Sequence, residues 1–117
     1  MYRAKIKRVY DKPEKTDGYR MLVDRLWPRG IKKEDAHLDE WNKELCPSTA
    51  LRKAFNHKEE LFEMFALRYR EELTGKEEEL HRVKAILDHQ NLTLIYAAKD
   101  PKINHAIILL DVLKNVK

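Results

Sequence analysis

The feature that most constrains the fold is one apolar run near the end of the chain, residues 92–98, which reads Leu-Thr-Leu-Ile-Tyr-Ala-Ala. No other predicted strand is apolar without interruption. Such a strand is expected where both faces of a sheet are covered, as in parallel sheets packed between other elements. The run therefore predicts the central strand of an α/β sheet.

Two further strands are predicted in the first quarter of the chain. Residues 3–10 alternate between basic and apolar side chains, as a strand near the edge of a sheet does. Residues 20–26 contain the run Met-Leu-Val and end at Trp27-Pro28, because a proline cannot donate to a strand ladder.

The middle of the chain is predicted to be helical. Asp39 is placed to cap a short helix in which Trp41 and Leu45 fall one turn apart. Ser48 is a favourable N-cap for a second helix over residues 49–55.

Three more helices complete the predicted order of elements. Asn56 begins a capping-box pattern that predicts a helix over about residues 58–73, and apolar spacing predicts another over 77–89. The pair Asp100-Pro101 is read as an N-cap and a first helical residue, which begins the last helix.

Alternating strands and helices predict a single α/β domain over residues 1–117, with a small, mostly parallel sheet packed with helices. The C-terminal helix follows the central strand. Hydrophobic residues make up 43% and charged residues 38% of the chain, which excludes a disordered or a membrane-spanning protein. No apolar leader is present, so we expect a cytoplasmic protein with no membrane partner.

Metal and thiol chemistry have weak support in the sequence. Cys46 is the single cysteine, so Cys-x-x-Cys pairs are absent, and the five histidines show no His-x-x-x-His spacing. We therefore predict no metal site and no cofactor. The 24 basic and 20 acidic residues give a net charge of +4, which favours anionic partners.

Polar residues gather after the two most apolar strands. Asp24, Arg25 and Arg29 follow the Met-Leu-Val run, while Lys99 and Asn104 follow the central strand. Ligands of open α/β sheets bind beyond the carboxyl ends of the strands, so both groups are predicted to line one pocket.

The chemistry of these residues favours an anionic ligand. The planar forks of Arg25 and Arg29 suit phosphate or carboxylate, and Lys99 adds a third cation. His105 and Asp24 are the candidate catalytic acid and base, since imidazole and carboxylate side chains commonly serve in these roles. An ion pair between Asp24 and an arginine, and a hydrogen-bonded structural histidine, are the simpler alternatives.

Four more residues are candidate ligand contacts beside Asn104. Each has a structural alternative: core packing for Trp27, a place within the strand for Tyr96, a helix cap for Asp100 and a capping turn for His57.

The motifs together resemble a known family. Asp24-Arg-Leu-Trp-Pro-Arg-Gly30, the segment Ala-Ala-Lys-Asp-Pro that ends at residue 101, and Asn104-His-Ala106 are similar to the YeaO-like bacterial proteins of unknown function. The resemblance covers nearly the whole chain and implies an α/β fold. Longer relatives resemble rhodanese-type or cysteine-phosphatase loops, with a cysteine where this chain has Tyr96 and another near Asn104. Both of these cysteines are absent from this chain, so what the resemblance implies here is an anion pocket without thiol chemistry.

Two functional hypotheses follow, and whether the protein is an enzyme stays open. The first is a hydrolase or transferase that acts on a phosphorylated or nucleotide small molecule. The alternative is a non-catalytic module that senses a metabolite or binds nucleic acid through the basic residues of strand 3–10, with Tyr19 and Trp27 available for stacking. The sequence leaves the ligand and the oligomeric state open.

Overall fold

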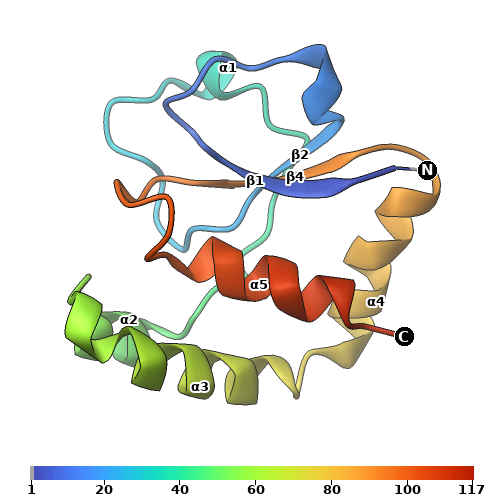
Figure 1. Ribbon diagram of the computed structural model, residues 1–117. Helices are drawn as coiled ribbons and strands as arrows, with labels where there is room; N and C mark the ends of the chain where they lie inside the picture. Colours follow the sequence, from blue (N-terminus) through green and yellow to red (C-terminus); the bar gives the residue numbers. More distant parts are fainter. Residues whose placement is uncertain (1) are drawn as a thin grey trace.

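In the part of the chain that the structure describes, four parallel strands form one sheet in the order β1-β4-β2-β3. The computed structural model describes residues 2–117 and places β4 in the interior of the sheet, between β1 and β2 (Figure 1). The predicted parallel α/β sheet with the apolar run at its centre is therefore confirmed. The strands are β1 (Ala4–Arg8), β2 (Tyr19–Leu22), β3 (Glu40–Trp41) and β4 (Leu92–Tyr96).

Strand β4 is apolar because both of its faces are covered. Leu92, Leu94 and Tyr96 belong to the main core, whereas Ile95 packs with Leu22 in a smaller cluster on the other face. Helices α2 to α5 lie below the sheet in Figure 1, and the short α1 lies above it with the loops. A strand with apolar residues at successive positions satisfies both layers.

Within residues 2–117, five α-helices accompany the sheet, and α5 packs against β1, β4 and α3. The predicted C-terminal helix after the central strand is confirmed. Ser48 caps α2 as predicted, since its side chain accepts a hydrogen bond from the amide of Leu51. The helices are α1 (Lys33–Ala36), α2 (Thr49–Phe55), α3 (Phe62–Leu73), α4 (Glu77–Ala85) and α5 (His105–Lys114).

The helix predicted after Asp39 is wrong, because this segment forms β3. The Asp39 carboxylate accepts a hydrogen bond from the amide of Arg20 at 2.9 Å, and Asn42 donates its own amide to Leu22. These contacts tie the segment to β2 as an edge strand. Trp41 and Leu45 do not share a helical face: the Trp41 indole donates to the carbonyl of Asp24, and Leu45 packs in the main core.

The capping box predicted at Asn56 is also wrong. Asn56 has φ of 47° and ends α2 in the left-handed conformation, which asparagine tolerates better than most residues. A 3-10 turn over Glu59–Leu61 then leads into α3, so that helix begins later than predicted. The predicted helix over 77–89 likewise divides into α4 and a 3-10 turn at Ile86–Asp88.

A buried carboxylate organises the basic residues of β1. Asp17 is fully buried and forms ion pairs with Lys5 at 3.0 Å, with Lys7 at 3.1 Å and with Arg20. Burial opposes ionisation of Asp17, but its hydrogen bonds and the surrounding cations hold its pKa well below the usual range. The charges of Lys5 and Lys7 therefore serve the fold.

Among the described residues, no helix has both the length and the apolar character needed to cross a membrane.

Candidate functional site at the carboxyl edge of the sheet

The ends of β2 and β4 meet at one edge of the sheet, as predicted. The Val23 amide donates to the carbonyl oxygen of Ile95 at 2.9 Å, and the Ala97 amide donates to Asp24 Oδ2 at 2.9 Å. The loop after β4 then leads into α5 on the same side (Figure 1). The two polar groups identified in the sequence are therefore joined directly, through Asp24.

His105, the first residue of α5, completes this contact. Its Nε2 atom lies 2.8 Å from the carbonyl oxygen of Val23 and 3.2 Å from Asp24 Oδ1. A carbonyl oxygen can only accept, so Nε2 carries a proton and donates it to Val23. That N–H is directed at the carbonyl, which leaves Asp24 Oδ1 buried without a hydrogen bond. The imidazole thus fastens α5 to the end of β2.

Cys46 lies in the same cluster. Cys46 is 6% exposed, and its thiol donates toward the carbonyl oxygen of Val23, with Sγ 2.9 Å from that oxygen and 3.2 Å from the carbonyl oxygen of Asn42. Burial, with the charge of Asp24 as a second cause, raises the pKa of the Cys46 thiol to about 12. Because the thiolate is the nucleophile, a raised pKa and burial both disfavour nucleophilic chemistry at Cys46.

The loop between β4 and α5 uses its own side chains to satisfy its amides. Asp100 Oδ1 accepts from the amides of Lys102 at 2.8 Å and Ile103 at 3.1 Å. Asn104, 2% exposed, caps α5 by accepting from the amide of Ile107 at 3.0 Å. The prediction that Asp100 and Pro101 begin the last helix is wrong, since the Asp100 side chain closes a turn instead.

Backbone carbonyls rather than carboxylates hold the Arg25 side chain. Arg25 is half-buried, and its Nε donates to Pro47 at 3.2 Å. Within residues 2–117, neither Arg25, Arg29 nor Lys99 takes part in an ion pair. The predicted alternative of an ion pair between Asp24 and an arginine is therefore absent from the described structure.

Arg8, at the end of β1, also lies at this edge, whereas its sequence pattern predicted only a role in nucleic-acid binding. Its Nε donates to the carbonyl of Ala98 at 2.9 Å, and its guanidinium lies 5.0 Å from the ring centre of Tyr10. The Tyr10 hydroxyl donates to the carbonyl of Arg29 at 2.9 Å. Arg8 thus connects the segments that carry Arg29 and Lys99. No pattern in the sequence indicates that β1 pairs in parallel with β4, and it is this pairing that brings Arg8 to the edge.

The remaining candidate residues have structural surroundings. Trp27 is half-buried, donates its indole N–H to Ile31 at 2.7 Å and meets the Trp41 ring edge-on at 5.3 Å. Tyr96 is 2% exposed, and burial raises the pKa of its hydroxyl. His57 is exposed after α2, and no hydrogen bond or ion pair within residues 2–117 joins its side chain to the strand ends.

No group of three or more histidine, cysteine, aspartate and glutamate side chains in residues 2–117 is arranged to hold a metal ion.

These features define a small parallel α/β domain whose polar residues at the carboxyl edge mainly fasten its own backbone. The chain belongs to the family described as the inactive DUF488-N3 subclade, whose model matches residues 3–116.

Bacterial relatives cover nearly the whole chain. The uncharacterized protein YeaO of Escherichia coli (strain K12) is 53% identical over 110 residues, which cover 94% of this chain and 96% of YeaO. The uncharacterized protein Rv3073c of Mycobacterium tuberculosis (strain ATCC 25618 / H37Rv) is 36% identical over 111 residues, 95% of this chain and 93% of the relative. No solved structure matches the chain significantly.

Proposed function

We propose that this protein is a non-catalytic module that binds a small anion, such as a phosphorylated metabolite, at the carboxyl edge of its sheet. The contact of Arg8 with Ala98 carries the proposal. It fixes the guanidinium through Nε, and the two terminal nitrogens donate no hydrogen bond to any residue between 2 and 117. An arginine held in this way presents a planar fork to a phosphate or carboxylate at little entropic cost.

The neighbouring segments supply further positive charge. Tyr10 ties the Arg29 segment to Arg8, and Lys99 directly follows the carbonyl that Arg8 contacts. Both side chains are exposed. An anion at Arg8 therefore has two more cations on adjoining segments, whereas Arg25 is committed to the carbonyls of residues 46 and 47.

The hydrogen bonds of the predicted acid and base favour binding over catalysis. His105 is engaged with Val23, and Asp24 Oδ2 accepts from Ala97. The thiol of Cys46 is protonated because burial raises its pKa. The family's description as an inactive subclade supports the same conclusion. A hydrolase or transferase that uses His105 or Asp24 stays a prediction, which the experiment below tests.

The nucleic-acid alternative has less support. Lys5 and Lys7 pair with the buried Asp17, and the Tyr19 hydroxyl donates to Glu40 at 2.8 Å. Trp27 is half-buried and hydrogen-bonded. An extended phosphate backbone needs a row of free cations beside exposed rings, so these contacts favour a small ligand.

The test is ligand-dependent stability. Phosphate or pyrophosphate at roughly ten times its dissociation constant should stabilise the fold by about 1.4 kcal/mol relative to chloride at equal ionic strength. The variant Arg8→Ala with Lys99→Ala should lose this response, and the variant Arg25→Ala with Arg29→Ala should retain part of it through Arg8. Lys15→Ala with Lys53→Ala, two exposed cations elsewhere, is the matched control.

Two outcomes would contradict the proposal. An undiminished response in Arg8→Ala with Lys99→Ala would show general salt stabilisation instead of a site. Hydrolysis of a generic phosphomonoester by the wild type that disappears in His105→Ala would show that the protein is an enzyme.

A further inference from the structure

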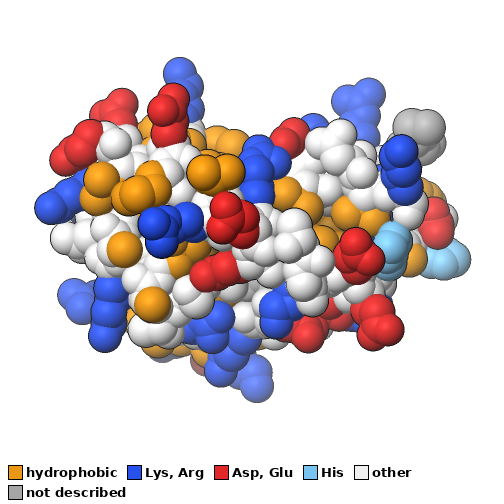
Figure 2. Space-filling view, turned by 90° about the horizontal axis from the view of Figure 1, so that it is seen from below, with side chains coloured by type: hydrophobic (Ala, Val, Ile, Leu, Met, Phe, Trp, Pro, Cys, Tyr) orange, Lys and Arg blue, Asp and Glu red, His pale blue; other side chains and the backbone are white. Residues whose placement is uncertain are grey.

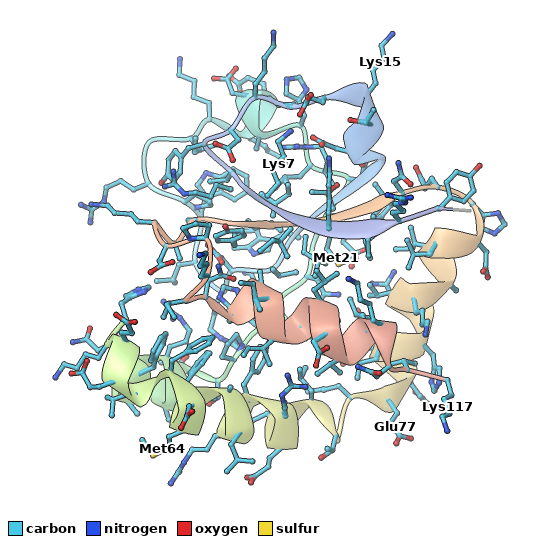
Figure 3. All side chains as sticks on the ribbon, viewed as in Figure 1. Lys7, Lys15, Met21, Met64, Glu77 and Lys117 are labelled. Carbon is cyan, nitrogen blue, oxygen red and sulfur yellow. The ribbon has the colours of Figure 1, made fainter. Side chains whose placement is uncertain are left out.

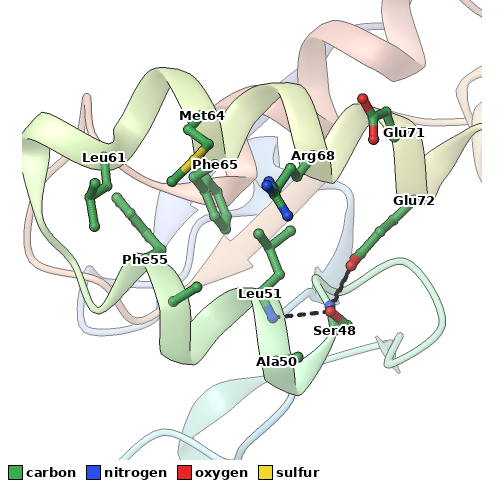
Figure 4. Close-up of a pocket in the computed structure, with 11 residues that line it drawn as sticks. Ser48, Ala50, Leu51, Phe55, Leu61, Met64, Phe65, Arg68, Glu71 and Glu72 are labelled. Atoms are coloured by element: carbon green, nitrogen blue, oxygen red, sulfur yellow. Dashed lines mark hydrogen bonds between the residues drawn. The ribbon is translucent and has the colours of Figure 1, made fainter.

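Helices α2 and α3 enclose an apolar groove that the fold leaves open (Figure 4). Its volume is about 690 Å³. Met64, which lines it, is 45% exposed, and Leu67, on the next turn of α3, is 61% exposed. The apolar residues that line it are Ala50, Leu51, Ala54, Phe55, Leu61, Met64 and Phe65.

The groove lies on a face where hydrophobic side chains reach the surface among charged ones (Figure 2). Single exposed apolar residues are ordinary, but a continuous apolar groove with a charged rim is typical of an interaction surface. The surface of α3 is therefore a candidate interface rather than part of the anion site.

Two opposite charges at the rim identify the kind of occupant. Arg68 and Glu71 both line the groove, both are exposed, and neither takes part in an ion pair within residues 2–117. The neighbouring charges of α3 are already used: Arg70 pairs with Asp111 at 2.9 Å, and Glu72 accepts hydrogen bonds from Ser48 (Figure 4). Arg68 and Glu71 are thus a cation and a carboxylate without a role in the monomer.

We infer that the groove is the interface of a homodimer, with a second copy of this chain related by a two-fold axis. A two-fold contact pairs the same surface with itself, so residues at two positions meet reciprocally. When two α3 helices cross antiparallel, Arg68 meets Glu71 of the partner subunit, and Glu71 meets the partner subunit's Arg68. A peptide of one charge sign would satisfy only one of the two.

The apolar residues fit the same arrangement. The axis passes midway between positions 68 and 71, which places Leu67 within about one helical turn of it. Leu67 is then covered by the partner copy, as expected for the most exposed large apolar residue of α3. The same two-fold contact therefore pairs both Arg68 and Glu71 and removes the apolar surface from water.

The dimer should be weak. Helix α3 has 12 residues, which span about 18 Å, so a face two helices wide belongs to the small end of specific interfaces, near or below about 1,200 Å² in total. We expect a dissociation constant of about 10 to 100 µM, typical of small and transient contacts.

The test is sedimentation equilibrium of the full chain from about 1 to about 500 µM, a range that brackets this constant. Arg68→Glu and Glu71→Arg should each weaken self-association at least about tenfold, because two attractive pairs become repulsive. An equimolar mixture of the two variants should associate again, since positions 68 and 71 are then both acidic in one subunit and both basic in the other. A merely structural role of either side chain would not produce this rescue.

Lys15→Glu is the control, because it changes the net charge as Arg68→Glu does and lies at the opposite end of the molecule from Met64 (Figure 3). Circular dichroism verifies that each variant is folded. The inference is overturned if the wild type stays monomeric at every concentration. This holds even if the monomer binds an amphipathic peptide in the groove. Self-association that neither charge variant changes, or a mixture without rescue, overturns it as well.

Discussion

Replacement of His105 by alanine distinguishes a structural histidine from a catalytic one. The structure gives the imidazole three neighbours: the carbonyl of Val23 at 2.8 Å, Asp24 Oδ1 at 3.2 Å and the Tyr69 ring, which it meets edge-on at 6.3 Å. His105→Ala removes all three contacts. If these contacts give His105 a structural role, the fold should lose stability.

The magnitude follows from these contacts. The hydrogen bond to Val23 contributes about 1 kcal/mol, and the edge-on contact with Tyr69 contributes about 0.5 to 1 kcal/mol. The buried Oδ1 atom of Asp24 then loses the imidazole 3.2 Å away, its only polar neighbour among the described ion pairs, which costs about 1 kcal/mol more. His105→Ala should lower the free energy of unfolding by about 2 to 4 kcal/mol.

Urea unfolding at pH 7, followed by circular dichroism, measures this loss. His89→Ala is the matched control, because His89 is exposed and its side chain forms no hydrogen bond within residues 2–117, so its effect should stay within about 0.5 kcal/mol. A residue kept only for catalysis is often neutral or unfavourable for stability. A loss below about 1 kcal/mol for His105→Ala would refute the fastening role and restore the catalytic hypothesis.

Four further predictions test other parts of the structure. Asp17→Asn should lower the free energy of unfolding by about 3 to 5 kcal/mol at pH 7. Because the folded-state pKa of Asp17 is lowered, the stability that its carboxylate contributes is complete above about pH 5 and declines below about pH 4. In urea unfolding, the difference in stability between wild type and variant should therefore become smaller below about pH 4. The Cys46 thiol should react with Ellman's reagent at pH 8 at least about 100-fold more slowly in the folded protein than in urea, and equal rates would contradict its burial. Gly18→Ala should lower the free energy of unfolding, measured by thermal unfolding, by more than about 2 kcal/mol. The reason is that φ of Gly18 is 64° and a Cβ there would lie 2.3 Å from the carbonyl oxygen of Asn91. Arg29→Met should unfold within about 1 kcal/mol of wild type in anion-free buffer, since its side chain is exposed; a larger loss would indicate a structural partner.

Local patterns predicted the elements whose residues interact with near neighbours in the chain. The N-cap of Ser48 and the helix that follows it were predicted correctly, because the cap involves the amide of Leu51 only three residues away. The segment after Asp39 was not, because its conformation depends on hydrogen bonds to β2, about twenty residues earlier. Asn56 was misassigned for a related reason, since asparagine is favourable both at a helix start and in the left-handed conformation at a helix end.

By itself, the sequence determined the α/β class with a mostly parallel sheet and the interior position of residues 92–98, since the apolar pattern and the alternation of strands and helices are enough for these. The polar residues after the strands predicted the edge at which they gather, whereas the sequence left the pairing direction of the first two strands open. The tertiary structure alone decided what those polar residues do. The contact of His105 with Val23 spans 82 positions, and that of Asp24 with Ala97 spans 73. Whether a side chain awaits a ligand or fastens the backbone depends on partners this distant, and no local pattern encodes them.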